Sequence, residues 1–303
     1  MRVAITGASG LIGSALRESL RRDGHEVLRL VRGEPRTPQA DEVRWSPSAG
    51  YVDVERLEGL DAFVHLAGAG VGDRPWTPGY RKTVLDSRVE GTGAIASALA
   101  QLRSAPEVLV SASAIGFYGN GGDRVLSEDA RQGEGFLAEV VGRWEDAAEP
   151  ARAAGIRVVH PRSGLVMTRR GGLLPRLLLP FKLGVGGRVG SGRQWWSGIS
   201  LADEVAALRF LVEHHELSGP VNLAAPLPAR NAEWTELIGD RLHRPTFMRA
   251  PAPVLELLGK PLGDQLAEML LFGQRVEPAA LSAAGFSFTH PDARSILDWA
   301  LSH

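Results

Sequence analysis

The sequence predicts an α/β fold in which helices cover both faces of a doubly wound parallel sheet. The chain opens with a short apolar segment, residues 3–5, followed by a glycine-rich turn and an apolar helical pattern from Leu11. Further short apolar segments then alternate with longer segments of helical spacing. This alternation is typical of parallel strands joined by crossover helices.

The expected elements can be placed in order along the chain. After the first helix, strands are expected at residues 26–31, 43–45, 61–68, 107–111, 156–160 and 220–223. Long helices are expected at residues 77–100, 135–154 and 201–215, and an apolar helix follows Gly171-Gly172. From residue 231 onward the pattern is helical, with amphipathic stretches near residues 233–242, 254–258, 266–271 and 293–301.

The composition limits the function classes open to the chain. Its 303 residues include 34 basic and 35 acidic side chains without a basic stripe, so nucleic acid is not an expected partner. The absence of cysteine excludes disulfides, thiolate metal sites and thiol nucleophiles. His214 and His215 are adjacent rather than one helical turn apart, so no metal site is expected.

No apolar run reaches the ~18 residues of a membrane span, so no membrane partner is expected. We expect a soluble, cytoplasmic protein that binds a small-molecule substrate. The sequence leaves the oligomeric state open, with a homodimer as the candidate assembly.

The glycine-rich turn has the spacing of a dinucleotide-binding motif. Gly7 permits a tight turn, Gly10 allows a phosphate to come close, and Gly13 lets the helix pack on the strand. Backbone N–H groups at a helix N-terminus favour negative charge, so Ser9, Leu11 and Ile12 are expected beside a pyrophosphate. An ordinary glycine-rich turn is the alternative. The motif favours a Rossmann-type fold.

The end of the second strand predicts which dinucleotide binds. An acidic residue there holds the 2′-hydroxyl of NAD, whereas an arginine accommodates the 2′-phosphate of NADP. Arg32 occupies this place, and its planar fork pairs well with phosphate, so NADP(H) is the predicted cofactor. A solvated loop arginine is the alternative interpretation, and the nearby Glu34 favours NAD.

The same geometry predicts the extent of the sheet domain. Residues 1–163 are expected to form the NADP-binding Rossmann domain, which residues 199–225 rejoin through strands near Ile199 and Pro220. Residues 164–198 and 226–303 are expected to form a smaller, mostly helical C-terminal domain over the carboxyl edge of the sheet. The substrate pocket is expected between the two.

Further motifs match one known family over nearly the whole chain: His65-Leu66-Ala67-Gly68, Val89-x-Gly91-Thr92, residues 111–119, Pro161-Arg162 and residues 199–205. With these motifs the chain resembles the extended short-chain dehydrogenase/reductases of the NAD-dependent epimerase/dehydratase family. It more closely resembles an atypical epimerase-like subfamily with a helical C-terminal domain, through Ser87-Arg88-Val89, Trp144-Glu145, residues 161–164, 179–184, 190–192, 222–226, 273–278 and 284–286. The resemblance implies that Leu66, Ala67, Gly68, Ser111, Pro161 and Arg162 lie around the cofactor.

The chain departs from that family where the chemistry is usually done. Members of the family carry a Tyr-x-x-x-Lys pair, in which the lysine lowers the pKa of the proton-donating tyrosine. Here Phe136 and Val140, or one residue later Leu137 and Val141, occupy the pair. Ser200 replaces the usual histidine of a later motif. The catalytic serine remains, as Ser113 or Ser111.

Other side chains are candidates for the missing roles. Tyr118 follows the fifth strand and is either a substitute proton donor or a structural residue with a buried partner. Arg88 replaces the family's usual asparagine and binds either a substrate carboxylate or phosphate, or a helix carboxylate such as Glu90 or Glu145. Arg193 and Trp196 lie in a glycine-rich segment that either lines a substrate pocket or packs on its own aromatics.

The sequence therefore predicts an NADP(H)-binding oxidoreductase or epimerase-like enzyme that acts on a small polar substrate. The alternative is a catalytically inactive NADP(H)-binding sensor or scaffold, because the usual proton-transfer pair is missing. Phe136 and Val140 disfavour a sugar-nucleotide epimerase of the ordinary type.

Overall fold

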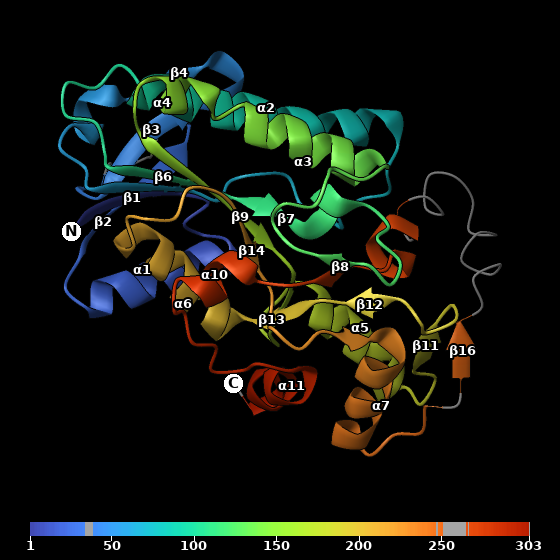
Figure 1. Cartoon of the computed structure of the whole chain (residues 1–303). Coiled ribbons are helices and arrows are strands. Elements are labelled where there is room, and N and C mark those ends of the chain that lie inside the picture. Colours follow the sequence, from blue (N-terminus) through green and yellow to red (C-terminus); the bar gives the residue numbers. More distant parts are fainter. Residues whose placement is uncertain (34–38, 247, 251–264, 266, 303) are drawn as a thin grey trace.

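The computed structural model describes residues 1–33, 39–246, 248–250, 265 and 267–302, in which strands and helices alternate (Figure 1). The helices are α1 (Leu11–Arg22), α2 (Pro78–Leu99), α3 (Phe136–Asp146), α4 (Glu149–Ala153), α5 (Leu173–Lys182), α6 (Leu201–Glu213), α7 (Asn231–Leu242), α10 (Ala279–Ala283) and α11 (Ala293–Ser302). The main strands are β1 (Arg2–Thr6), β2 (Glu26–Arg32), β3 (Glu42–Ser46), β4 (Tyr51–Val52), β5 (Ala62–His65), β6 (Val108–Ser111), β7 (Ser113–Ala114), β9 (Arg157–Ser163) and β14 (Gly219–Leu223). Short strands are β8 (Val125–Leu126), β10 (Leu165–Met167), β11 (Gly187–Val189), β12 (Trp195–Trp196), β13 (Gly198–Ser200), β15 (Ala229–Arg230), β16 (Met248–Ala250) and β17 (Arg275–Val276).

The central sheet has nine strands, with the order β14-β9-β6-β5-β1-β2-β3-β4 and with β7 beside β9. Its strands are parallel except for the antiparallel pair β3 and β4. From β1 the chain proceeds to β2 and β3 on one side and later to β5, β6, β9 and β14 on the other. Such a reversal creates a crevice at the carboxyl ends of the strands, where ligands bind in open parallel sheets. The doubly wound Rossmann-type sheet is confirmed.

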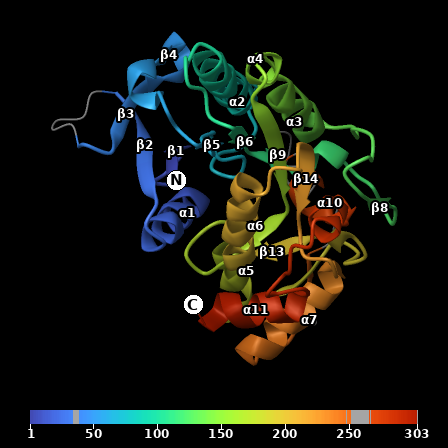
Figure 2. The same cartoon turned by 60° about the vertical axis from the view of Figure 1, so that its left-hand side comes forward.

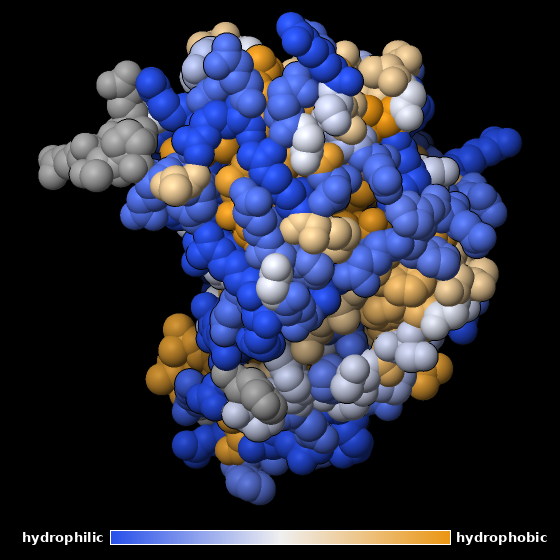
Figure 3. Space-filling model, turned by 90° about the vertical axis from the view of Figure 1, so that its left-hand side faces the viewer, coloured by the Kyte–Doolittle hydropathy of each residue, from blue (hydrophilic) through white to orange (hydrophobic). Residues whose placement is uncertain are grey.

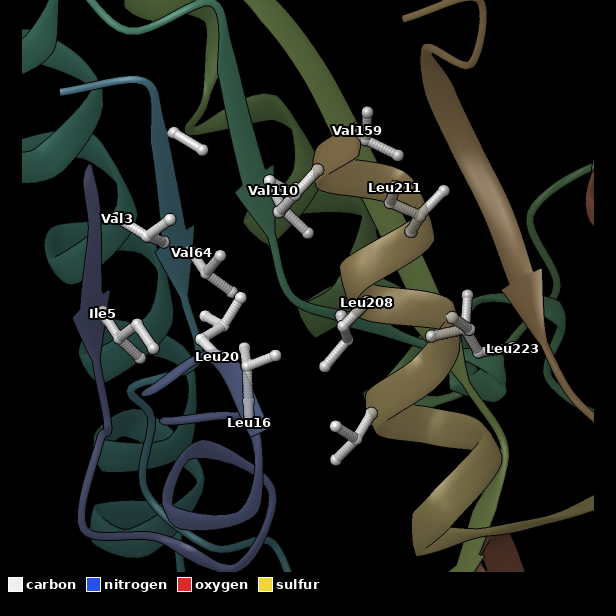
Figure 4. Close-up of a cluster of buried hydrophobic side chains, with 14 of the residues drawn as sticks. Val3, Ile5, Leu16, Leu20, Val64, Val110, Val159, Leu208, Leu211 and Leu223 are labelled. Carbon is white, nitrogen blue, oxygen red and sulfur yellow. The ribbon is translucent and has the colours of Figure 1, made fainter. Parts of the chain in front are cut away.

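One face of the sheet is covered by α1 and α6, which lie side by side (Figure 2). Leu16 and Leu20 of α1 and Leu208 and Leu211 of α6 point into a common core over strand residues such as Val64 (Figure 4). All five side chains are fully buried. The helical spacing of leucines in both helices is therefore explained by packing on this face.

The opposite face carries α2 and α4, which contribute Ile95 and Ala151 to a second core. Adjacent strand residues alternate between the two cores, so that Phe63 lies in the second and Val64 in the first. Because both faces are covered, central strands such as β5 and β6 are apolar at consecutive positions. This explains why residues 61–68 and 107–111 could be recognised as strands, although β5 ends at His65.

A third core lies beyond the carboxyl end of the sheet, between α5, α7 and α11. It contains Leu178, Trp234 and Leu297, one from each helix, and also Trp196. Short two-stranded sheets accompany these helices, among them β10 with β13 and β12 with β15. The helices at residues 233–242 and 293–301 are confirmed, whereas the stretch at 254–258 lies outside the described residues.

Two expectations about individual elements were wrong. The strand near Ile199 does not rejoin the central sheet, because β13 pairs with β10, and only β14 returns to it beside β9. The helix expected over residues 135–154 is divided into α3 and α4. Pro150 explains the break, because it lacks an N–H and its ring would clash with the carbonyl of Asp146, the last residue of α3.

Glu204 lies at the start of α6 and is 1 % exposed. Its Oε1 accepts a hydrogen bond of 2.6 Å from Ser163, and its Oε2 has no partner among the described residues. Burial disfavours the ionised carboxylate and raises the pKa of Glu204 from 4.5 to about 7. This carboxyl therefore stabilises the fold most when it is protonated.

We predict that Glu204→Gln increases the free energy of unfolding at pH 8 relative to the wild type, by on the order of 3 kcal/mol. Between pH 4.5 and 7 the unfolded carboxyl ionises while the buried one stays protonated, so the wild type loses stability as the pH rises and the glutamine variant does not. The difference should vanish near pH 4. Urea unfolding at both pH values measures it.

Glu213→Gln on the partly exposed end of the same helix is the matched control, and its effect should not change with pH in this way. Equal pH dependence in Glu204→Gln and the wild type would contradict the prediction.

Candidate functional site

The glycine turn between β1 and α1 is held by backbone contacts that leave no room for side chains. Gly7 has a φ of +66°, and a Cβ atom there would lie 2.8 Å from the carbonyl oxygen of Leu66. A Cβ atom at Gly13 would lie 2.2 Å from the oxygen of Gly7. The structure therefore explains Gly7 by the turn and Gly13 by the close packing of α1 on the turn.

The N-terminus of α1 is prepared for an anion. Its N-cap is Gly10, no side chain caps its amides, and its first turn contains no acidic residue. The amides of Leu11 and Ile12 are thus the first donors of an uncapped helix, where the helix dipole favours negative charge. A Cβ atom at Gly10 would contact only the oxygen of Gly7, at 3.2 Å, so packing alone does not require glycine at this position.

A groove of about 740 Å³ runs from this turn along the carboxyl ends of β1, β2 and β5. Its volume is within the range typical of small-molecule and cofactor sites. The walls bring together distant segments, which are Gly7–Gly10, residues 29–32, Trp45, Pro47, residues 66–70, Asp73, Thr83 and Ser87. Of the predicted cofactor residues, Gly7, Ser9, Gly10, Arg32, Leu66, Ala67 and Gly68 line this groove.

Arg32 lies at the far end of the groove, between it and a second hollow of about 440 Å³. The second hollow is also lined by Ser46, the last residue of β3, and by Ser48, which lies two residues further along the chain. Arg32 is exposed, and within the described residues its guanidinium has no hydrogen-bond or ion-pair partner. Arg29, which also lines the groove, is engaged by Asp41 and lowers the pKa of that carboxyl to about 2.

The wall formed by residues 66–70 is held by side chains from two neighbouring elements. Thr6 Oγ1 accepts hydrogen bonds from the amides of Leu66 and Ala67, and it also bonds the Nδ1 of His65. Ser87 Oγ accepts from the amide of Ala69 at 3.0 Å. His65 is fully buried, and burial lowers its pKa from 6.5 to about 3, so it is a neutral core histidine.

Ser113 belongs to a buried polar network rather than standing alone. Its hydroxyl donates a 2.5 Å hydrogen bond to Glu145 Oε1, and Arg162 binds both oxygens of that carboxylate at 2.8 and 2.9 Å. Although burial alone would raise it, the hydrogen bonds and charge of Arg162 hold the pKa of Glu145 below its ordinary value. Ser111 is also fully buried, and its hydroxyl has no partner among the described residues.

Arg162 and Pro161, which the resemblance placed around the cofactor, are not among the residues that line the groove. Arg162 is 3 % exposed, and its guanidinium is engaged by Glu145 and by the hydroxyl of Tyr118 at 3.1 Å. It also stacks on Phe117, with its Cζ 3.5 Å from the ring centre. Pro161 lies within β9 opposite Val221 of β14. Both residues thus serve the interior of the sheet.

Tyr118 has the buried structural environment that the sequence left open as one alternative. It is 1 % exposed, and its hydroxyl donates to Asn222 Oδ1 at 2.6 Å while accepting from Arg162. Asn222 donates in turn to the carbonyls of Leu126 and Glu277. With both of its hydrogen-bonding directions used inside the protein, Tyr118 is poorly placed to protonate a substrate.

The positions of the missing tyrosine and lysine are occupied by apolar packing. Val140 is 1 % exposed inside α3. Phe136 begins α3, where the ring of Trp76 packs against its edge and the guanidinium of Arg81 lies 4.3 Å from its ring centre. The backbone amides of Phe136 and Leu137 donate hydrogen bonds to the carboxylate of Glu268. The residues described here supply no hydroxyl or ammonium group at these positions.

Arg193 and Trp196 differ in their surroundings. Trp196 is 4 % exposed and belongs to the third core, with its indole N–H donating to the carbonyl of Leu270. Arg193 is exposed on the adjoining turn. Trp196 therefore packs in a core that is shared with several helices.

Several groove residues were not predicted from the sequence. Trp45, Pro47 and Thr83 line it although none of them belongs to a binding motif. Their position in the sheet could have identified two of them, because Trp45 and Pro47 lie at the carboxyl end of β3, which is parallel and adjacent to the strand that carries Arg32. Ser87 belonged to a family motif, but only its position beside Ala69 shows what it does.

A family model described as the NAD dependent epimerase/dehydratase family matches residues 3–224. The chain belongs to this family. A second model, described as a domain of unknown function (DUF1731), matches residues 250–300. Among similar proteins of this family, epimerase family protein ML0860 of Mycobacterium leprae is 43 % identical over 98 % of this chain and 95 % of its own length. Epimerase family protein YfhF of Bacillus subtilis is 34 % identical over 100 % of this chain and 97 % of its own.

Solved structures of family members have the same fold. The human epimerase family protein SDR39U1 (isoform 2), solved with NADPH, is 32 % identical, with a TM-score of 0.88 and full coverage of both chains. A nucleoside-diphosphate sugar epimerase from Corynebacterium glutamicum is 34 % identical, with a TM-score of 0.82 over 99 % of this chain and 58 % of that one. The glycine turn and its groove thus lie in a chain of an NAD(P)-dependent epimerase family.

On the face shown in Figure 3, hydrophilic residues predominate and hydrophobic residues lie in separate patches. Among the residues that the structure describes, none of the helices combines the length and the apolar character that crossing a membrane requires.

We predict that Gly10→Ala and Gly13→Ala separate cofactor binding from folding. The methyl group of Gly10→Ala should weaken NADPH binding by about tenfold or more, because it stands where the phosphate approaches, and the melting temperature should change little. Gly13→Ala should lower the free energy of unfolding by about 1–3 kcal/mol, because its methyl group overlaps the oxygen of Gly7. Calorimetric titration and urea unfolding of both variants measure the two effects. Unchanged NADPH affinity in a folded Gly10→Ala variant would count against the groove as the cofactor site.

Proposed function

We propose that this chain is an NADP(H)-dependent oxidoreductase or epimerase-like enzyme that acts on a small polar substrate. The observation that carries the proposal is the groove itself, which joins the helix N-terminus at Gly10 to the exposed guanidinium of Arg32, both of them without a side-chain partner in the part of the chain that the structure describes. These are two anion-binding groups at the two ends of one site. A dinucleotide with a pyrophosphate and a 2′-phosphate has anions at both places.

The preference for NADP(H) over NAD(H) is supported by the charges around Arg32. The other arginine of this wall, Arg29, is neutralised by Asp41 and Glu42, so Arg32 is the wall's exposed cation within the described residues. Ser46 and Ser48 border the adjoining hollow and offer hydroxyl donors to the same phosphate. The human SDR39U1 structure, which contains NADPH, favours the same cofactor, although other similar folds were solved with NAD.

Arg32→Ala is expected to weaken NADPH binding by more than tenfold and to leave NADH binding unchanged. An arginine–phosphate hydrogen bond contributes about 2 kcal/mol to binding. NADH has no 2′-phosphate, so its binding does not depend on this hydrogen bond. Calorimetric titration of the wild type and the variant with both nucleotides tests this.

The matched control is Arg22→Ala, which removes an exposed arginine from the opposite end of α1. Its NADPH affinity should equal that of the wild type. Equal loss of NADPH and NADH in Arg32→Ala, or a wild type that binds neither nucleotide, would refute the cofactor assignment.

The chemistry follows from what the side chains around Ser113 do. NADPH supplies or receives a hydride when it is bound. The hydroxyl of Ser113 donates its hydrogen bond to the ionised Glu145. Its oxygen is therefore left to accept a hydrogen bond from a substrate hydroxyl. Tyr118 is engaged elsewhere, so water is the proton source that we propose. A conjugated substrate, whose carbanion takes a proton from water, requires the missing tyrosine least.

NADPH oxidation should therefore be detectable with a conjugated enone or quinone and absent with a sugar nucleotide. With an enone or quinone that carries a hydroxyl group, Ser113→Ala should lower kcat by about tenfold while NADPH affinity stays the same, since it removes the acceptor for that hydroxyl. Ser97→Ala, on the exposed face of α2, is the control. Absorbance of NADPH measures turnover, and no oxidation with any of these substrates, aldehydes included, would contradict an oxidoreductase role.

The apolar packing at Phe136 and Val140 favours a second candidate function, an NADP(H)-binding sensor or scaffold without turnover. Such a protein needs the groove and Arg32 but not a proton-transfer pair. NADPH-dependent capture of a partner protein, with no product formed, distinguishes it from the enzyme.

A further inference from the structure

Arg88 is a cation held inside the protein beside the inner wall of the groove. It projects from α2, and its Nη1 donates to the carbonyls of Ala69 at 2.8 Å and Val84 at 3.1 Å. Its guanidinium lies 4.8 Å from the ring centre of Trp144. A Cβ atom at Gly68, which lines the groove, would lie 3.4 Å from its Cζ. Arg88 therefore packs directly against Gly68, a residue of the groove wall.

The charge of Arg88 has no counterion within the described residues. Of the two helix carboxylates considered from the sequence, Glu145 is bound by Arg162 and Ser113, and Glu90 is exposed. Neither forms an ion pair with Arg88. Burial lowers the pKa of Arg88 from 12.5 to about 10, and no carboxylate offsets that effect. An unpaired buried charge is costly, so proteins retain one where a ligand supplies the opposite charge.

The remaining donors of Arg88 are available. A guanidinium has five N–H groups, and the two on Nη1 are used by backbone carbonyls. Nε and Nη2 have no partner among the described residues, yet they are not sealed in the interior. Together they form a planar fork that matches two oxygens of one carboxylate or phosphate.

We propose that Arg88 binds an oxyanion, a carboxylate or phosphate, at the inner end of the groove. The proposal deepens the proposed function and rests on it for the position of the cofactor. It names the substrate class as an acidic small molecule, unless the oxyanion is the cofactor's own pyrophosphate. In addition, the hydrogen bond from Nη1 of Arg88 to the carbonyl of Ala69 holds the guanidinium in place.

The probe is inorganic phosphate, titrated calorimetrically into the full chain at constant ionic strength set with chloride. All proteins carry Arg32→Ala, which removes the other arginine that would bind phosphate in this groove. Saturable phosphate binding is expected, weakened at least tenfold by Arg88→Gln and less by Arg88→Lys. The lysine variant keeps the charge and so remains informative if the glutamine variant does not fold. Arg81→Gln, from the same helix, is the control and should bind phosphate normally.

A second titration, in saturating NADPH, identifies the source of the oxyanion. Phosphate that still binds the NADPH complex through Arg88 indicates an acidic substrate, whereas competition between phosphate and NADPH indicates the cofactor's pyrophosphate. Phosphate binding that is absent, or equal in Arg88→Gln and its parent, overturns the proposal and leaves Arg88 as a support for Ala69. A wild-type protein that binds no NADPH refutes the proposed function separately, because the phosphate titration of the cofactor-free protein is still interpretable.

Discussion

The architecture depends on two places where backbone meets backbone without an intervening side chain. At Gly13 the first helix touches the carbonyl of Gly7, and at Gly7 the turn touches the carbonyl of Leu66. These contacts bring the N-terminus of α1 against the carboxyl end of β5, and Thr6 fastens the same strand end by accepting its amides. The groove exists because three segments of the chain are drawn together there. The same glycine contacts consequently determine both the shape of the groove and the packing of α1 on the sheet.

Most of the sheet could be predicted from the sequence because its strands are buried on both faces. Continuous apolar runs identified β1, β2, β5, β6 and β9, and leucines at helical spacing identified α1 and α6. The short strands were harder, since β12 and β15 have two residues each and carry no periodic signal. The pairing of β13 with β10 instead of the central sheet also depends on distant contacts that a local pattern does not contain.

The two ends of the site differed in how far they could be predicted. Arg32 could be singled out from the sequence because the end of the second strand of such a sheet is the expected place of the adenosine ribose, and the structure places Arg32 in the groove. Around Ser113 the residue types were recognised, but not their partners. Glu145, 32 residues further along the chain, joins Ser113 to Arg162, and Arg162 joins both to Tyr118. This network joins Ser113, Arg162 and Tyr118, three candidate catalytic or cofactor residues, in one buried polar cluster.

The contact between Glu268 and α3 ties the construction of the fold to the order of synthesis. The first two amides of α3 are capped by a carboxylate that follows them by 132 and 131 residues. A growing chain that has passed α3, and even β14, still lacks the group that completes this helix. The N-terminal end of α3 therefore gains these two hydrogen bonds only after the C-terminal segment has been synthesised. A different C-terminal region would have to supply an acceptor at the place of Glu268 for the end of α3 to keep both hydrogen bonds.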